Sequence, residues 1–230
     1  MLTHAVDVGL TTTYLMYKFL SDSAAGFGGY EDIAYTITVA KGHPGYLAIL
    51  DSGATTFPEH WGYCHDAGSC CMEADWKKSC CDRVYQCTNY SGCTTGQCTT
   101  SAGSSSKIHG TLNGVGQLFV AGIGGIRRPL GGVGYQQIEF RAPFGRVPGV
   151  SYVRASYRSL YGLIESSWAS PENGRTYSHN VTVPPNCVAT LRIQGARVWE
   201  SGSLIQTTRD DEGLHVLAFG SGEYSVVAEY

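Results

Sequence analysis

The second half of the chain is a series of short β-type segments separated by turns. Seven such segments follow one another, at residues 134–143, 150–159, 162–170, 176–184, 188–195, 214–222 and 223–230. They are rich in β-branched and aromatic residues, and glycine, proline, serine or asparagine separates them. This length and spacing are typical of an antiparallel β-sandwich. We therefore predict a β-sandwich domain over residues 131–230, which follows Arg127-Arg128-Pro129 and a glycine-rich stretch.

The first half has a different, mainly helical pattern. Helical spacing of apolar residues predicts helices over residues 5–22, 30–41 and 110–126. In the second of these, Ile33, Ile37 and Ala40 share one face. Residues 45–61 are predicted to be extended, with a turn at residues 51–53. The fold class is therefore α+β, and three helices are too few to bury an independent core.

Composition excludes several classes of protein. Only 15% of the 230 residues are charged, 30 are glycine and the net charge is −3. A highly charged disordered chain and a Lys/Glu-rich coiled coil are excluded. The mild negative charge gives no basic surface for nucleic acid. No apolar run approaches the roughly 18 residues that a membrane helix needs.

Eight of the nine cysteines crowd into one segment, residues 62–107. Their spacing contains no C-x2-C pair, so it does not match a structural zinc site. Three explanations stay open: a disulfide framework formed in an oxidising compartment, a mistranslated or unusual insertion, and metallothionein-like metal binding. We favour disulfides and a secreted protein. The disulfide candidates are Cys64, Cys70, Cys71, Cys80, Cys81, Cys87, Cys93 and Cys98.

Two N-x-[ST] sequons accompany this segment and the β half. They are Asn89-Tyr90-Ser91 and Asn180-Val181-Thr182. Both suit an exposed position in a secreted protein, although such triplets are also frequent by chance.

A carboxylate lies between aromatic residues in the stretch from Gly53 to Trp61. Aromatic faces stack on sugar rings, and a carboxylate such as Glu59 binds hydroxyls or activates water. A second candidate is His109, which directly precedes the third predicted helix. Taken alone, each residue is better explained by a structural role: Glu59 as an exposed loop glutamate, and His109 as a surface or capping residue.

Four stretches in a fixed order resemble the C-terminal part of bacterial-type α-L-rhamnosidases, glycoside hydrolase family 78. The first stretch is His4–Leu10 followed by a helix, and the second is Pro44–Trp61, similar to the family's hairpin with a G-A-T-T-x-W-E-x-W ending. The third, His109–Arg127, is similar to its N-H-x-x-x-G-S-V-G-E-W helix. The fourth is the β half, at Ala155–Tyr157, Ser159–Gly162, Glu165–Trp168, Val181–Asn186 and Phe219–Tyr224.

This resemblance implies a fold and an activity. The family has an (α/α)6 six-hairpin barrel followed by a C-terminal β-sandwich, and it hydrolyses terminal α-L-rhamnosides with inversion. Residues 1–130 would then be the last helices of an incomplete barrel, with residues 62–107 as a cysteine-rich insertion. The resemblance places the general base on Glu59, a sugar-hydroxyl contact on His109 and a wall of the sugar subsite on Trp61. It implies no metal and no organic cofactor.

The chain departs from the family pattern at Pro58, Ile108 and Gln117, where the family has tryptophan, asparagine and glutamate. The family's general acid lies upstream of the matching region. We therefore expect a fragment that is inactive alone. Its expected partners are rhamnose-containing glycosides or polysaccharides and the missing N-terminal part of the barrel. The alternatives are a non-catalytic carbohydrate-binding protein and a secreted cysteine-rich interaction protein.

Overall fold

The computed structural model of the chain describes residues 12–21, 29–41, 45–51, 54–58, 93–94, 97–98, 108–170 and 175–229. The chain divides into two compact units. One contains residues 1–16 and 36–115, and the other contains residues 17–35 and 116–230. The second unit carries both large β-sheets. The predicted domain division at residue 130 stays a prediction.

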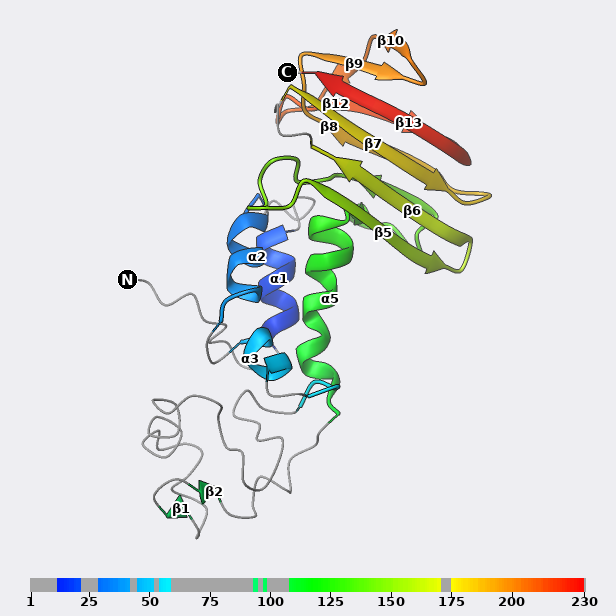
Figure 1. Ribbon diagram of the computed structural model, residues 1–230. Coiled ribbons are helices and arrows are strands. Elements are labelled where there is room, and N and C mark those ends of the chain that lie inside the picture. The colour runs from blue at the N-terminus through cyan, green and yellow to red at the C-terminus, as the bar shows by residue number, and fades with distance from the viewer. Residues whose placement is uncertain are drawn as a thin grey trace. The chain divides into compact units, whose positions relative to one another are not determined.

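The helices occupy the first half of the chain, as the sequence predicts (Figure 1). The helices predicted over 5–22 and 30–41 are confirmed over their described parts, while residues 46–51 are helical, so the extended structure predicted there is wrong. A short apolar run such as Tyr46-Leu47-Ala48-Ile49-Leu50 fits a buried strand or a buried helix equally well. The helical elements are α1 (Thr13–Ser21), α2 (Glu31–Thr38), α3 (Tyr46–Asp51), η4 (Gly110–Gly114), α5 (Val115–Gln117) and η5 (Leu118–Ile123).

The third predicted helix is present but is not a regular α-helix. It begins as a 3-10 turn, η4, and ends as a π-helical turn, η5. Glycines within it lower its intrinsic helix propensity. Close packing explains the glycine at position 122, because a Cβ there would lie 2.9 Å from the Cβ of Ser21. Tertiary packing therefore determines the local geometry of this helix.

The buried face of α2 differs from the one that apolar spacing suggests. Glu31, Ala34 and Thr38 are buried, whereas Ile33 is 46% exposed. The buried face of α2 thus contains Glu31, while Ile33 lies on the exposed side. The ion-pair partner of Glu31, described below, explains why a glutamate can be buried there.

The six-stranded sheet has the order β10-β9-β13-β7-β6-β5, and all its pairs are antiparallel. Alternating burial along β6 and β7 shows that one face is covered and the other is open. The strands are β5 (Tyr152–Ser159), β6 (Gly162–Ala169), β7 (Thr176–Val183), β9 (Arg197–Glu200), β10 (Ser203–Ile205) and β13 (Gly222–Glu229).

The five-stranded sheet has the order β11-β12-β8-β4-β3. Its β4–β8 pair is parallel, so the expectation of a purely antiparallel sandwich is wrong at this pair. A parallel partner must come from a distant segment, and β4 and β8 are separated by three strands of the other sheet. The strands are β3 (Ile126–Arg127), β4 (Gln137–Phe140), β8 (Val188–Ile193), β11 (Thr208–Arg209) and β12 (His215–Phe219).

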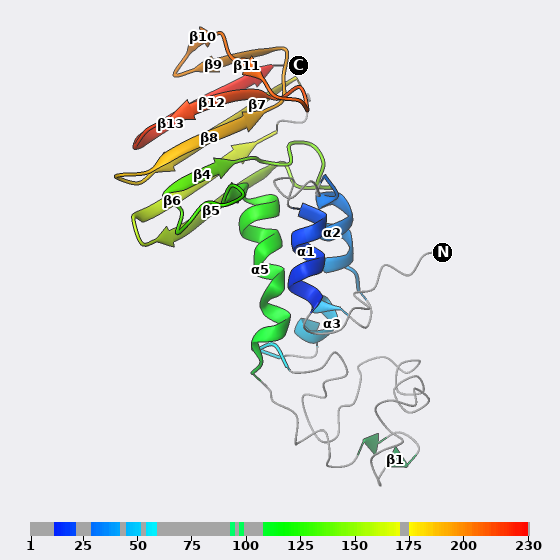
Figure 2. The same ribbon diagram turned by 180° about the vertical axis from the view of Figure 1, so that it is seen from behind.

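The two sheets stack as layers, and the pair is visible from both sides in Figures 1 and 2. Rings of β4 and β7 meet across the interior, with Phe140 and His179 at 6.2 Å between centroids. Phe144 adds edge contacts to Trp168 at 5.5 Å and to His179 at 5.6 Å. Trp168 is 1% exposed and donates from Nε1 to the Ile123 carbonyl at 2.8 Å. The predicted β-sandwich is therefore confirmed, and these rings share its core with many buried aliphatic side chains.

Two further strands lie in the cysteine-rich segment. They are β1 (Cys93–Thr94) and β2 (Gln97–Cys98), which pair antiparallel with Cys93 opposite Cys98. Across the described parts of the chain, no helix has the length and apolarity needed to cross a membrane.

Candidate functional site

The structure describes one of the three predicted site residues. His109 is half-buried, directly before η4. Glu59 and Trp61 lie outside the described residues, and so do the first six disulfide candidates, Cys64 to Cys87. For Cys93 and Cys98 the structure describes the backbone strands only.

A backbone hydrogen bond joins the two segments that carry the candidate site. The N–H of His109 donates to the carbonyl of Phe57 at 2.8 Å. Phe57 precedes Glu59 by two positions in the sequence. The described residues on the two sides of the cysteine-rich segment, Phe57 and His109, therefore lie side by side. Such proximity is expected if residues 62–107 are an insertion between two segments that are neighbours in the fold.

Tyr46 of α3 contacts both segments. Its ring packs edge-on against Phe57, with 5.4 Å between centroids and 75° between planes. Its hydroxyl donates to the carbonyl of Leu112 in η4 at 2.8 Å. Tyr46 is 3% exposed and Leu112 is fully buried, so both contacts exclude water. Buried hydrogen bonds of this kind fix backbone position, because leaving one unmade costs about 1–3 kcal/mol.

Gly114 allows the end of η4 to lie directly on α1. A Cβ at Gly114 would lie 2.5 Å from the backbone nitrogen of Tyr14. Real Cβ atoms do not approach a backbone so closely, so only glycine fits without a shift of the helix. The backbone that follows His109 is thus held by its packing on α1 as well as by Tyr46.

Metal binding was one explanation for the cysteines. Among the described residues, no group of three or more histidine, cysteine, aspartate or glutamate side chains could hold a metal ion. The ninth cysteine, Cys187, is a buried free thiol, and burial raises its pKa. The side chains of the other eight cysteines are not described, so the disulfide framework stays a prediction.

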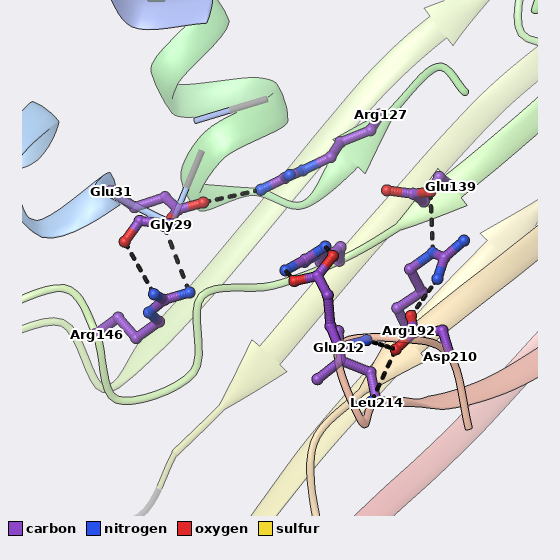
Figure 3. A network of polar contacts seen from close by, with 10 residues as sticks. Gly29, Glu31, Arg127, Glu139, Arg146, Arg192, Asp210, Glu212 and Leu214 are labelled. Atoms are coloured by element: carbon purple, nitrogen blue, oxygen red, sulfur yellow. Dashed lines mark hydrogen bonds and ion pairs between the residues drawn. The ribbon is translucent and has the colours of Figure 1, made fainter. Parts of the chain in front are cut away.

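Several described carboxylates outside this region are engaged in ion pairs (Figure 3). Glu31 accepts from Arg127 at 3.1 Å, and both side chains are 4% exposed. Arg127 also donates from Nε to the Ala121 carbonyl at 3.0 Å. Arg146 lies 3.9 Å from the other oxygen of Glu31 and donates to the Gly29 carbonyl at 2.9 Å. Burial lowers the pKa of Arg127, and the charge of Glu31 opposes that shift.

A second group of ion pairs lies on the five-stranded sheet (Figure 3). Arg192 bridges Glu139 and Asp210, and Arg141 makes a two-pronged contact with Glu212 at 2.9 and 2.6 Å. The hydrogen bond from Arg141 holds the pKa of Glu212 below its usual value. Burial alone would raise the pKa of Asp210, but hydrogen bonds from the Leu214 amide and Arg192 outweigh it and lower the pKa.

These ion pairs indicate a structural role rather than acid–base chemistry. Carboxylates held ionised by arginines are poor proton donors near neutral pH. Sequence reasoning singled out none of them, because Glu31 and Arg127 are 96 positions apart and each looks ordinary in its own segment.

The structure thus defines a protein with helical segments followed by a two-sheet β-sandwich. Residues 125–203 match the family described as Bacterial alpha-L-rhamnosidase C-terminal domain. The match begins at Gly125, directly before β3, and includes most of the sandwich. The chain therefore resembles the C-terminal part of α-L-rhamnosidases, which are glycoside hydrolases.

Individual proteins extend this resemblance to nearly the whole chain. An α-L-rhamnosidase of Streptomyces avermitilis is 27% identical over 97% of this chain, which spans 18% of that relative's length. The crystal structure of the S. avermitilis enzyme complexed with L-rhamnose aligns with a TM-score of 0.70 at 23% identity, covering 98% of this chain and 18% of that one. The structure of α-L-rhamnosidase from Dictyoglumus thermophilum aligns with a TM-score of 0.69 at 22% identity, covering 99% and 21%.

Proposed function

We propose that this chain is the C-terminal part of a secreted, inverting α-L-rhamnosidase that acts on terminal α-L-rhamnosides of glycosides or polysaccharides. The match of residues 125–203 to the rhamnosidase C-terminal domain carries the proposal. The similarity over 97% of the chain supports extending it to the helical half. Because the chain spans under a quarter of these relatives, the activity belongs to a longer assembly in which this part supplies one side of the site.

In the proposed mechanism, Glu59 acts as the general base. Inversion at a sugar carbon uses one carboxylic acid to protonate the leaving oxygen and one carboxylate to activate water on the opposite face, about 6.5–9.5 Å apart. Glu59 would accept the proton of that water. The general acid would come from the part of the polypeptide that precedes the matching region.

His109 and Trp61 would orient the sugar. The hydrogen bond between the His109 amide and the Phe57 carbonyl supports this assignment, because it brings the His109 backbone to the segment that leads into Glu59. A half-buried imidazole can exchange hydrogen bonds with sugar hydroxyls, and the indole of Trp61 can stack on the ring. Binding and orientation by these groups need no metal or organic cofactor.

The remaining barrel would cover helical faces that are open in this chain. Phe19, Ile33 and Phe119 are each between 46% and 49% exposed, although they lie on helices. Apolar side chains on a helix surface normally pack against another element. This exposure supports the missing N-terminal part of the barrel as the partner of this chain.

The test is hydrolysis of an aryl α-L-rhamnoside by this chain and by a version extended with the coding sequence that precedes Met1 in the genome. We expect turnover from the extended protein only. In that protein Glu59→Gln should lower kcat by about 10²–10⁴-fold, the usual contribution of a general base. His109→Ala should mainly raise KM.

Glu223→Gln is the matched control, because Glu223 is exposed on a strand of the sandwich. This variant should leave kcat and KM unchanged. No turnover by the extended wild-type protein would contradict the hydrolase and favour a non-catalytic sugar-binding protein, which the proline at position 58 also suits. Turnover that survives Glu59→Gln would contradict the assignment of the base.

A further inference from the structure

We propose that Asn180 is an acceptor for an N-linked glycan on the open face of the six-stranded sheet. The proposal does not depend on the catalytic assignment of Glu59. It rests on the second sequon, Asn180-Val181-Thr182, and on the place that the fold gives to its residues.

The register of β7 points the sequon outward. Tyr177, His179, Val181 and Val183 alternate along this strand and are all buried in the sandwich. Side chains alternate between the two faces of a strand, so Asn180 and Thr182 lie together on the opposite face. Asn180 is exposed there, and its amide makes no hydrogen bond with any described residue.

The positions around Asn180 carry small polar side chains. Ser167 of β6 and Ser225 of β13 lie directly opposite it on the neighbouring strands. Ser178 and Thr182 precede and follow it on the same face of β7. Cross-strand neighbours on one face are about 4.5–5.5 Å apart, so large side chains at these positions would crowd the amide. Serines leave room for a sugar attached to its nitrogen.

The same composition argues that this face meets solvent in a longer polypeptide. A face that docks onto another domain is expected to present large apolar or aromatic side chains. The positions next to Asn180 present serine and threonine instead, and the larger side chains of this face, Val227 and Trp199, lie further from it, toward β9. A glycan at Asn180 would fit such a face and would prevent another domain from covering it.

The chemistry requires one co-reactant, an oligosaccharide linked to a polyprenyl diphosphate. The Asn180 amide nitrogen forms a bond to the anomeric carbon while the bond from that carbon to the diphosphate oxygen breaks. The amide loses one proton and the polyprenyl diphosphate leaves. Threonine or serine two positions after the asparagine is required for recognition, and Thr182 satisfies this.

The test is translation of the full chain, fused to a cleavable secretory leader, in the presence of microsomes. Only chains protected from added protease, and therefore translocated, are analysed. We expect a glycopeptide containing Asn180 and a gel shift that a glycan-removing amidase reverses. The shift should persist in Thr182→Ser and disappear in Thr182→Ala and Asn180→Gln, all made in an Asn89→Gln background.

Asn89 provides an internal control for access to the glycosylating enzyme. Translocated wild-type chains that carry a glycan at Asn89 alone would overturn the proposal. Translocated Asn89→Gln chains without any glycan would overturn it equally. Because transfer occurs on the emerging chain, neither result depends on how well the variants fold.

Discussion

At the residue scale, a neutral histidine inside the sandwich makes stability sensitive to mild acid. His179 is fully buried, and Ser166 Oγ lies 2.8 Å from its Nε2. The Ser166 hydroxyl donates its proton to the Gly124 carbonyl at 2.6 Å, so it can only accept from Nε2–H. Nδ1 is then unprotonated and buried, with no hydrogen-bond partner among the residues that the structure describes. Burial lowers the pKa of His179 to about 3.

The direction of this pH dependence follows from the pKa of His179 in the folded and in the unfolded chain. An unfolded histidine, with a pKa of about 6.5, takes up a proton below that pH, whereas folded His179 stays neutral down to about pH 3. Stability should therefore be fully present above pH 6.5 and fall as the pH drops, by about 2 kcal/mol between pH 8 and pH 5. Asp210 and Glu212, whose folded pKa values are lowered, lose their contributions only at lower pH.

Urea unfolding at a series of pH values measures this dependence. His179→Gln keeps a donor for Ser166 without an ionisable group, so its stability should change less between pH 8 and pH 5. Wild-type stability that stays flat over this range would show that His179 does not carry the acid sensitivity.

At the scale of elements, the ion pair between Glu31 and Arg127 ties the start of α2 to strand β3. Glu31→Gln would leave the buried charge of Arg127 without the opposite charge of Glu31, which should cost about 3–5 kcal/mol. Arg154 and Glu165 provide a matched surface pair, at 3.3 Å but with 70% and 32% exposure. Glu165→Gln should therefore cost at most about 1 kcal/mol.

Chemical unfolding of both variants at neutral pH gives the comparison. The double variant Glu31→Leu/Arg127→Met should be more stable than Glu31→Gln, because it removes both buried charges. Equal, small losses for Glu31→Gln and Glu165→Gln would show that the buried pair does not fasten α2.

The elements also show how far sequence patterns reach. Alternating apolar residues and turn residues correctly predicted all seven β-segments. This worked because each of these strands either has one buried and one exposed face or consists of consecutive buried residues. The patterns missed β9 and β10, which have four and three residues, and the two-residue strands β3 and β11. A signal for β9 and β10 was present, since Ser201 and Gly202 between them have positive φ angles of 49° and 83°. Serine-glycine between two short runs was a usable hairpin signal.

Two errors came from contacts that local patterns do not contain. The burial of Glu31 depends on Arg127, and the parallel β4–β8 pair depends on strands of the other sheet lying between them in the chain. For the site, the motifs indicated His109 as a candidate, and the structure adds the backbone hydrogen bond from His109 to Phe57, which no local pattern contains. The fastening of both segments by Tyr46 has no local sequence signal, because Leu112 is 66 positions away.

At the scale of the whole molecule, the sandwich depends on residues that precede the predicted division at residue 130. The carbonyls of Ile123 and Gly124 accept from Trp168 and Ser166, and the carbonyl of Gly125 accepts from the Arg141 amide at 2.9 Å. A chain of residues 131–230 would lose all three acceptors and strand β3. Each buried donor left unpaired costs about 1–3 kcal/mol, a large share of a marginal folding free energy.

We therefore expect residues 131–230 to unfold at much lower urea concentration than residues 116–230. The longer piece should in turn be less stable than the full chain, because it contains Arg127 but lacks Glu31. In residues 116–230, Arg127→Met should restore part of the lost stability, because it removes a buried charge that lacks Glu31. In the full chain, where Glu31 is present, the same substitution should not stabilise the protein to the same extent. Equal unfolding midpoints for residues 131–230 and 116–230 would instead support an independent domain that begins at residue 131, since the carbonyls of residues 123–125 would then contribute nothing to its stability.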